Sequence, residues 1–329
     1  MNDLNSQIFS KPSIGVAIPT MNRPGMLREA IRSALDQERP PDEIFVSDNS
    51  REPDRTLVSE FPNVSLRYHW HDKPPMHIED HWTWALGQPQ TDYVCWLEDD
   101  NLFRSDHLSR LAQAVDQYPQ APILGTLALV VRQREASAQG AIFAPVWTSD
   151  LLHPSIPVAI RRDWALASYL FGSPVASSAV MIKRKAYLDH PFTKCHCWMP
   201  LDRWLWAQFA ALGDFIYIPQ ITVLYRLHGT NHASTIKRTS HIRESSLVFR
   251  LIIHKMQSLG IDPQKAVQEL SASLSSAARD QHVLELLRSR QWEWTAKLLP
   301  EIYGGSLRAA VPRVVALGLG ALLRKMMKE

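Results

Sequence analysis

The chain lacks the features that define several large classes of protein. Its 329 residues include three cysteines, Cys95, Cys195 and Cys197, which are too few for a disulfide framework and favour a reducing compartment. Residues 1–12 show neither the basic start nor the apolar stretch of a signal peptide. No run of about 18 apolar residues predicts a transmembrane helix. We therefore expect a cytoplasmic protein.

Strong net charge and glycine-rich phosphate loops are also missing. A net charge of +3 is too small to indicate a nucleic-acid partner, and we expect none. Neither GxGxxG nor GxxxxGK[ST] occurs, which tells against dehydrogenases and P-loop kinases. Hydrophobic residues at 45% and charged residues at 21% describe an ordinary globular protein with room for one large domain and an appendage.

The first hundred residues alternate between strand and helix patterns. Apolar runs at 13–19, 44–48, 64–68 and 93–97 predict buried strands, and helical spacing follows the first of them from Pro24. This alternation is typical of a parallel sheet flanked by helices. Ligands of such sheets bind at the carboxyl ends of the strands. We expect Pro19-Thr20, Asp48 and Glu98-Asp99-Asp100 to meet there.

The rest of the chain divides into a mixed part and a helical part. Helices are predicted at 105–118, 161–170 and 200–213, and strands at 123–131, 177–184, 214–219 and 221–228. Beyond residue 240 the pattern is helical, with segments at 246–256, 262–290 and after 306. We predict a catalytic domain at 1–239, with halves at about 13–104 and 105–239, and a helical region at 240–329.

Three consecutive acids end the strand in YVCWLEDDNLF, residues 93–103. Neighbouring carboxylates repel one another unless a cation or hydrogen-bond donors compensate. Glu98, Asp99 and Asp100 can hold a divalent cation that also binds phosphate oxygens. The alternative is that Asp100 or Asn101 caps the next helix. The three acids together favour the metal site.

Three other residues each allow a chemical and a structural interpretation. Asp48 could accept hydrogen bonds from a base or ribose, or could form an Asx turn in SDNS. Asp202 could be a general base, or a first-turn acid that stabilises its helix. His228, in YRLHGTNH, could bind a metal or be structural.

Five short segments together resemble inverting glycosyltransferases of family 2. They follow one another in the order found in that family and span roughly residues 13 to 235. The segments are IPTMNRP (18–24), VSDNS (46–50), LEDDN (97–101), PLDRWLWAQFAALGDFIYIP (200–219) and YRLH (225–228). The resemblance implies a GT-A fold, which is a nucleotide-binding α/β sandwich with a mostly parallel, mixed sheet.

The resemblance also implies roles for individual residues. Pro19, Thr20 and Arg23 would contact the nucleotide, and Asp48 would read the base. Asp99 and Asp100 look like the acidic pair of the DxD-type motif, with Asp99 facing the ribose and Asp100 as the main ligand of Mn²⁺ or Mg²⁺. Glu98 occupies the first position of that motif, where Asp is usual. Asp202 would be the acceptor-side base, and it follows Leu201 where the family commonly has Glu. His228 would contact the metal or the diphosphate.

The expected activity is metal-dependent transfer of a sugar, with inversion, from a nucleotide diphosphate to a hydroxyl acceptor. Bacterial surface polysaccharide or a lipid-linked glycan is the expected acceptor class. The alternatives are a sugar nucleotidyltransferase, and a nucleotide-sugar-binding or scaffolding protein without turnover. The apolar run at 314–323, followed by Arg324 and Lys325, is too short to span a bilayer. It predicts either a peripheral helix at the inner membrane face or a buried docking helix.

Overall fold

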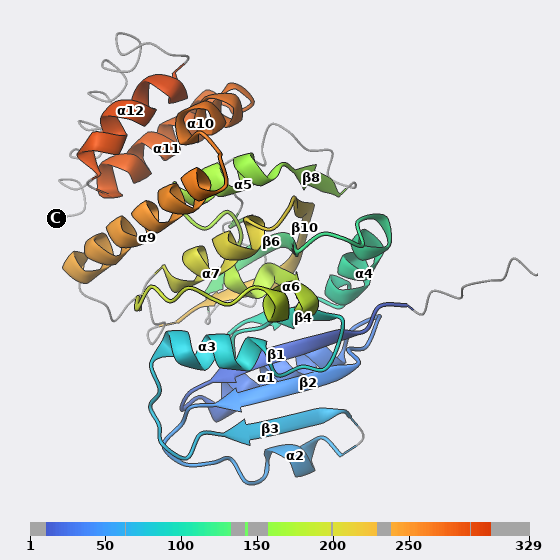
Figure 1. Cartoon of the computed structure of the whole chain (residues 1–329). Helices are drawn as coiled ribbons and strands as arrows, with labels where there is room; N and C mark the ends of the chain where they lie inside the picture. Colours follow the sequence, from blue (N-terminus) through green and yellow to red (C-terminus); the bar gives the residue numbers. More distant parts are fainter. Residues whose placement is uncertain are drawn as a thin grey trace, which may run out of the picture.

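A ten-stranded mixed sheet organises the chain (Figure 1). The structure is a computed structural model that describes residues 11–62, 64–132, 142–143, 157–198, 200–228, 238–289 and 291–303. Eight strands follow one another across the sheet in the order β3-β2-β1-β4-β9-β6-β10-β5, while β7 pairs with β6 and β8 with β10.

The first four strands are parallel and end at one edge. They are β1 (Ile14–Thr20), β2 (Glu43–Asp48), β3 (Leu66–Trp70) and β4 (Tyr93–Trp96). In the register of β1 and β2, Thr20 lies opposite Asp48, and Ala17 of β1 lies opposite Trp96 of β4. The segments that follow these strands therefore converge, as the alternating pattern predicted.

The second half of the sheet introduces antiparallel pairs. Strand β9 (Val180–Lys183) runs antiparallel to both β4 and β6 (Ile123–Arg132). Strand β10 (Phe215–Leu227) is parallel to β6. Three short antiparallel strands complete the sheet: β5 (Leu102–Phe103), β7 (Ile142–Phe143) and β8 (Val158–Ile160). The predicted mixed sheet is confirmed.

Two local predictions need correction. The two strands predicted at 214–219 and 221–228 are one strand, β10 (Phe215–Leu227), whose pairing with β6 shifts register between Tyr217 and Val223. Pro219 interrupts the pattern there because proline cannot donate to the ladder, and the chain accommodates it with an irregularity instead of ending the strand. Residues 177–179 form a short 3-10 turn, η1 (Ser177–Ala179), before β9 begins.

Helices cover both faces of the sheet and create two apolar cores. Helices α1 (Pro24–Leu35), α2 (Leu57–Glu60) and α4 (His107–Gln117) pack on one face. Helices α3 (Ile78–Leu86), α5 (Arg162–Tyr169), α6 (Arg184–Asp189) and α7 (Leu201–Ala210) pack on the other. Strand β1 serves both cores, because alternate side chains point to opposite faces: Ile14, Val16 and Ile18 enter the first and Ala17 the second.

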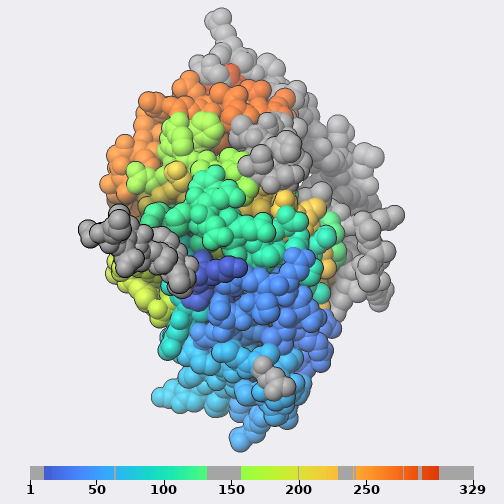
Figure 2. All heavy atoms as spheres, turned by 90° about the vertical axis from the view of Figure 1, so that its right-hand side faces the viewer, coloured from blue at the N-terminus to red at the C-terminus, as the bar shows by residue number. Residues whose placement is uncertain are grey.

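Four further helices extend the second core. They are α9 (Arg238–Ser258), α10 (Pro263–Ala272), α11 (Ser276–Ser289) and α12 (Trp292–Ile302). Val248, Phe249 and Ile252 of α9 belong to the same buried cluster as Trp206 of α7. Figure 2 shows these helices (orange) at one end of the molecule and the first strands (blue) at the other.

The helical region refines two predictions and leaves others untested. Residues 262–290, expected as one helix, contain α10 and α11 with a break between them. The predicted boundary at 239/240 falls in the first turn of α9 and stays a prediction. The apolar segment at 314–323 lies outside the described residues. Within the described residues, no helix is long and apolar enough to cross a membrane.

Candidate active site

A cavity of about 410 Å³ lies at the carboxyl edge of the parallel strands. Its wall includes residues from the loops after β1, β2 and β4, from the segment 75–82, and from the start of α7. Seven of the residues that the sequence predicted for the site line it: Pro19, Thr20, Arg23, Glu98, Asp99, Asp100 and Asp202.

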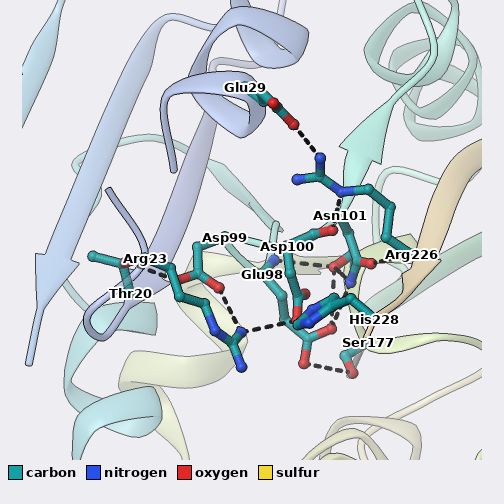
Figure 3. A network of polar contacts seen from close by, with 11 residues as sticks. Thr20, Arg23, Glu29, Glu98, Asp99, Asp100, Asn101, Ser177, Arg226 and His228 are labelled. Carbon is teal, nitrogen blue, oxygen red and sulfur yellow. Dashed lines mark hydrogen bonds and ion pairs between the residues drawn. The ribbon is translucent and has the colours of Figure 1, made fainter. Parts of the chain in front are cut away.

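Asp99 is held by residues from the loop after β1 (Figure 3). Its Oδ2 accepts a hydrogen bond from Thr20 Oγ1 at 2.7 Å, and its Oδ1 lies 3.0 Å from Arg23 Nη1. Burial raises the pKa of Asp99 to about 6, although Arg23 acts in the opposite direction. This carboxylate is therefore positioned by a hydroxyl from the last residue of β1 and a cation from the loop that follows.

Asp100 shares the same cation and also meets His228. Asp100 Oδ2 lies 2.9 Å from Arg23 Nη1 and 3.0 Å from His228 Nε2. The backbone oxygen of Asp100 accepts a hydrogen bond from Arg226, whose guanidinium also pairs with Glu29 of α1. Figure 3 shows Arg226 and His228 reaching the acids from the end of β10. The prediction that His228 belongs with the acidic cluster agrees with this placement.

Arg23 bridges the two acids as a built-in cation. Burial alone would lower its pKa, but the charges of Asp99 and Asp100 together raise it above the ordinary value for arginine. The Arg23 side chain is about a quarter exposed, at 26%. The position between two carboxylates is also where a divalent cation would be most favourable.

Glu98, the third acid, turns toward a different set of partners. Its Oε2 accepts a hydrogen bond from Asn101 Nδ2 at 2.8 Å, and its Oε1 lies 3.3 Å from Ser177 Oγ. Ser178 Oγ also contacts Asn101 Nδ2 at 3.0 Å and accepts from the Glu98 N–H. Burial, reinforced by the charges of Asp100 and Asp202, raises the pKa of Glu98 well above its ordinary value.

Asp202 lies in the first turn of α7 and faces the cavity. Burial raises its pKa, while hydrogen bonds from the Arg203 backbone and from Ser173 lower it. The neighbouring Arg203 points away and donates to the backbone oxygens of Tyr169 and Leu170. Asp202 is thus both the helix-start acid that the sequence offered as an alternative and a carboxylate at the cavity wall. A raised pKa makes a carboxylate a stronger base once it is ionised.

Asp48 lies apart from the cavity lining. Its Oδ1 accepts from the Ser50 N–H at 2.8 Å, which is the Asx-type contact expected as the alternative, and its Oδ2 accepts from Tyr68 Oη at 2.7 Å. Asn49, the next residue, reaches the cavity wall and is fixed by two hydrogen bonds to the backbone of Met76. A direct contact of Asp48 with a base stays a prediction.

The acidic residues suit a small hard cation only when other oxygens complete its coordination. No group of three or more His, Cys, Asp or Glu side chains forms a metal-binding cluster within the described residues. Asp100 and His228 offer two neighbouring donors, and Mg²⁺ commonly uses one or two carboxylates with phosphate oxygens and water. The residues therefore fit a metal that arrives with a diphosphate. The capping alternative is wrong, because α4 begins at His107 with Asp106 at its N-cap.

Several residues of the site were not predicted. Ser177 and Ser178 hold Glu98 from a turn that the sequence marked as strand. Trp198 lines the cavity and was not among the predicted site residues either. No local pattern signalled the contacts of Ser177 and Ser178, whereas a tryptophan four residues before the predicted base Asp202 was a usable signal for Trp198.

Comparison with known proteins supports the resemblance to glycosyltransferases. Residues 15–135 match the sequence model of Glycosyl transferase family 2. An uncharacterized glycosyltransferase of Haemophilus influenzae is 20% identical over 257 residues, covering 76% of each chain. The crystal structure of S. aureus TarS 1–349 in complex with UDP-GlcNAc has a TM-score of 0.62 at 14% identity and covers 93% of this chain and 89% of that one. The complex with UDP has a TM-score of 0.59 at 13% identity, covering 93% and 88%.

The sheet, the acidic edge and these structural likenesses define a protein of the GT-A-type fold. The comparisons support the resemblance seen in the sequence: residues 15–135 match glycosyl transferase family 2, and 76% of the chain is similar to a glycosyltransferase.

Proposed function

We propose that the protein transfers a sugar from a nucleoside diphosphate sugar to a hydroxyl of a glycan or lipid-linked acceptor, with inversion and with the help of Mn²⁺ or Mg²⁺. The observation that supports this most is that Asp202 lines the same cavity as the pair Asp99–Asp100. One wall thus offers a base for an acceptor, and another offers carboxylates suited to a cation and a diphosphate. TarS, similar in fold, is described with UDP-GlcNAc, which makes UDP the first nucleotide to test.

In the proposed reaction the chain supplies a base, a metal-binding pair and a polar donor site. The acceptor oxygen forms a bond to the anomeric carbon while its proton passes to a carboxylate oxygen of Asp202. The bond from that carbon to the phosphate oxygen breaks, and the nucleoside diphosphate leaves with the electron pair. Attack from the side opposite the leaving group inverts the configuration.

The donor side holds the departing group. Asp100 and His228 would hold the cation, which when bound stabilises the negative charge of the diphosphate. Pro19, Thr20, Arg23 and Asp99 would contact the nucleotide, as would Glu98 and Asp48. A place at the inner face of the membrane, through residues 314–323, remains part of the proposal.

Two measurements test this function. A thermal-shift panel of UDP, GDP, dTDP and CDP, each with and without Mn²⁺, should show stabilisation by one diphosphate that depends on metal and is lost in Asp100→Ala. Asp202→Asn should keep the nucleotide affinity but lose turnover, by roughly 10²–10⁴-fold. An unchanged rate in Asp202→Asn, or no shift with any nucleotide, would refute the assignment.

A further inference from the structure

One part of the cavity wall is apolar and plays no role in the reaction described above. It combines residues from α3 and the segment before it with residues from the loop before α7 and the first residue of α7. The apolar side chains of this wall are Pro75, Met76, Ile78, Trp82, Trp198, Pro200 and Leu201. Asp202 follows directly after Leu201 in the chain and lines the same cavity, so this wall belongs to the acceptor side of the proposed site.

Trp198 stands out in this wall because much of it remains accessible. It is 45% exposed although it lines a cavity. Its ring packs against His77, with the ring centroids 4.7 Å apart and the planes at 72°, an edge-to-face arrangement. A tryptophan usually gains stability by full burial, so an indole fixed at a cavity wall and left accessible is typical of a binding surface.

The loop that carries Trp198 is held in an unusual conformation. His196 has a φ of 55°, in the left-handed region that residues other than glycine seldom adopt. The carboxylate of Glu79, 1% exposed, accepts hydrogen bonds from the N–H groups of Cys195 at 2.7 Å and His196 at 2.8 Å. Strained turns persist where the surrounding structure holds them, and they cluster at ligand sites.

A second carboxylate fixes Trp198 itself. The N–H of Trp198 donates to Glu244 of α9 at 2.9 Å. The loop is therefore anchored from α3 on one side and from the C-terminal helices on the other. This explains how residues far apart in sequence present one indole to the cavity, and it gives the helical region a part in building the site.

We propose that Trp198, supported by His77, is a stacking platform for a pyranose ring of the acceptor. The inference rests on the proposed glycosyl transfer. A sugar ring has an apolar face of C–H groups that suits an indole and hydroxyls at its edge that suit polar partners. Asp202, on the same wall, requires one of those hydroxyls. An alkyl chain would use the apolar wall equally well but would offer Asp202 no proton to remove.

Ligand-observed saturation-transfer NMR tests the platform without knowledge of the natural acceptor. The probes are the methyl glycosides of glucose, galactose and N-acetylglucosamine at roughly 100 mM, which suits millimolar affinity, with decyl phosphate as the lipid probe, all in the presence of UDP and diamagnetic Mg²⁺. Trp198→Ala should weaken glycoside binding about tenfold, and Trp198→Phe should retain part of it. Both variants keep the backbone N–H that Glu244 binds.

Trp292→Ala is the matched control, because Trp292 is also exposed, at 62%, but lies on α12 away from the cavity lining. It should leave glycoside binding unchanged. Glycoside binding that is absent in the parent protein, or equal in Trp198→Ala, overturns the platform, and so does a Trp198-dependent signal from decyl phosphate alone. UDP binding is measured in the same samples: its failure counts against the proposed function, whereas its success with no glycoside effect counts against the platform only.

Discussion

Arg23 should compete with the divalent cation for the acidic pair. One nitrogen, Nη1, lies 3.0 Å from Asp99 and 2.9 Å from Asp100, so a cation that binds these acids must first displace the guanidinium. Removing the positive charge also removes its repulsion of the incoming ion. Both effects act in the same direction, and Arg23→Gln should therefore bind Mn²⁺ more tightly than the parent protein when no nucleotide is present.

The geometry sets the size of the effect. Two unit charges about 4 Å apart interact by about 4 kcal/mol at an effective dielectric constant of about 20. The cost of desolvation cancels most of this attraction in partly buried pairs. The acids are nearly buried, at 6% and 11% exposure, while Arg23 is 26% exposed. A net cost of about 1–2 kcal/mol for displacing Arg23 corresponds to roughly 5–30-fold in the Mn²⁺ dissociation constant.

The assay is a calorimetric titration of Mn²⁺ at about pH 8, above the value of about 6 to which burial raises the pKa of Asp99. Arg28→Gln is the matched control, because Arg28 pairs with Asp54 and Glu60 outside the cavity lining. It should leave the Mn²⁺ affinity unchanged. In a second titration, UDP should bind Arg23→Gln more weakly, since the diphosphate loses a cationic partner. Equal or weaker Mn²⁺ binding by Arg23→Gln would refute the competition.

Three further predictions concern the base, the loop and the helical region. Because burial raises the pKa of Asp202 above 3.8 and the base acts when ionised, kcat/KM should fall as pH drops through that raised value; a pH–rate profile without such a limb would contradict the role. Glu79→Ala should lower the free energy of unfolding by about 2–4 kcal/mol, because two N–H groups lose their acceptor; a urea titration showing no loss would contradict this anchoring. Burial against Phe171 lowers the pKa of His282 to about 3 from 6.5, so between these values the unfolded state binds the extra proton and stability falls on acidification. His282→Phe should reduce that slope by up to about 1.4 kcal/mol per pH unit, measured by urea titrations at several pH values.

Much of the acidic edge was predictable because it depends on local patterns. Apolar runs ending in polar residues located Thr20, Asp48 and the acids after β4, and the parallel arrangement brought these strand ends together. Residues 15–135, which the family match covers, contain these strand ends. In this part of the chain the hydrophobic periodicity of the sequence locates the strands, and a parallel arrangement of those strands places their ends at one edge of the sheet.

Contacts between residues far apart in the sequence, such as those that depend on the antiparallel strand β9, were not predictable in the same way. Glu98 meets Ser177 across a separation of 79 residues, because β9 enters the sheet between β4 and β6. The backbone N–H of Trp198 donates to Glu244, 46 residues later. Glu244 lies on α9, whose sequence predicts a helix but not this partner. Asp48 likewise meets Tyr68 only because β3 pairs with β2. Neither the strand order nor the choice of side-chain partner follows from periodicity.

Glu98, which stands where the family usually has Asp, explains how three consecutive acids can lie at one strand end. If all three were ionised without a divalent cation, three negative charges would repel one another at this strand end. The longer side chain of Glu98 instead reaches Asn101 and Ser177, and burial together with Asp100 favours its neutral form by raising its pKa. Repulsion then falls mainly on Asp99 and Asp100, which share the Arg23 guanidinium. The cluster is thus a charged pair beside a polar, hydrogen-bonded carboxyl group, and a divalent cation exchanging with Arg23 would meet two charges rather than three.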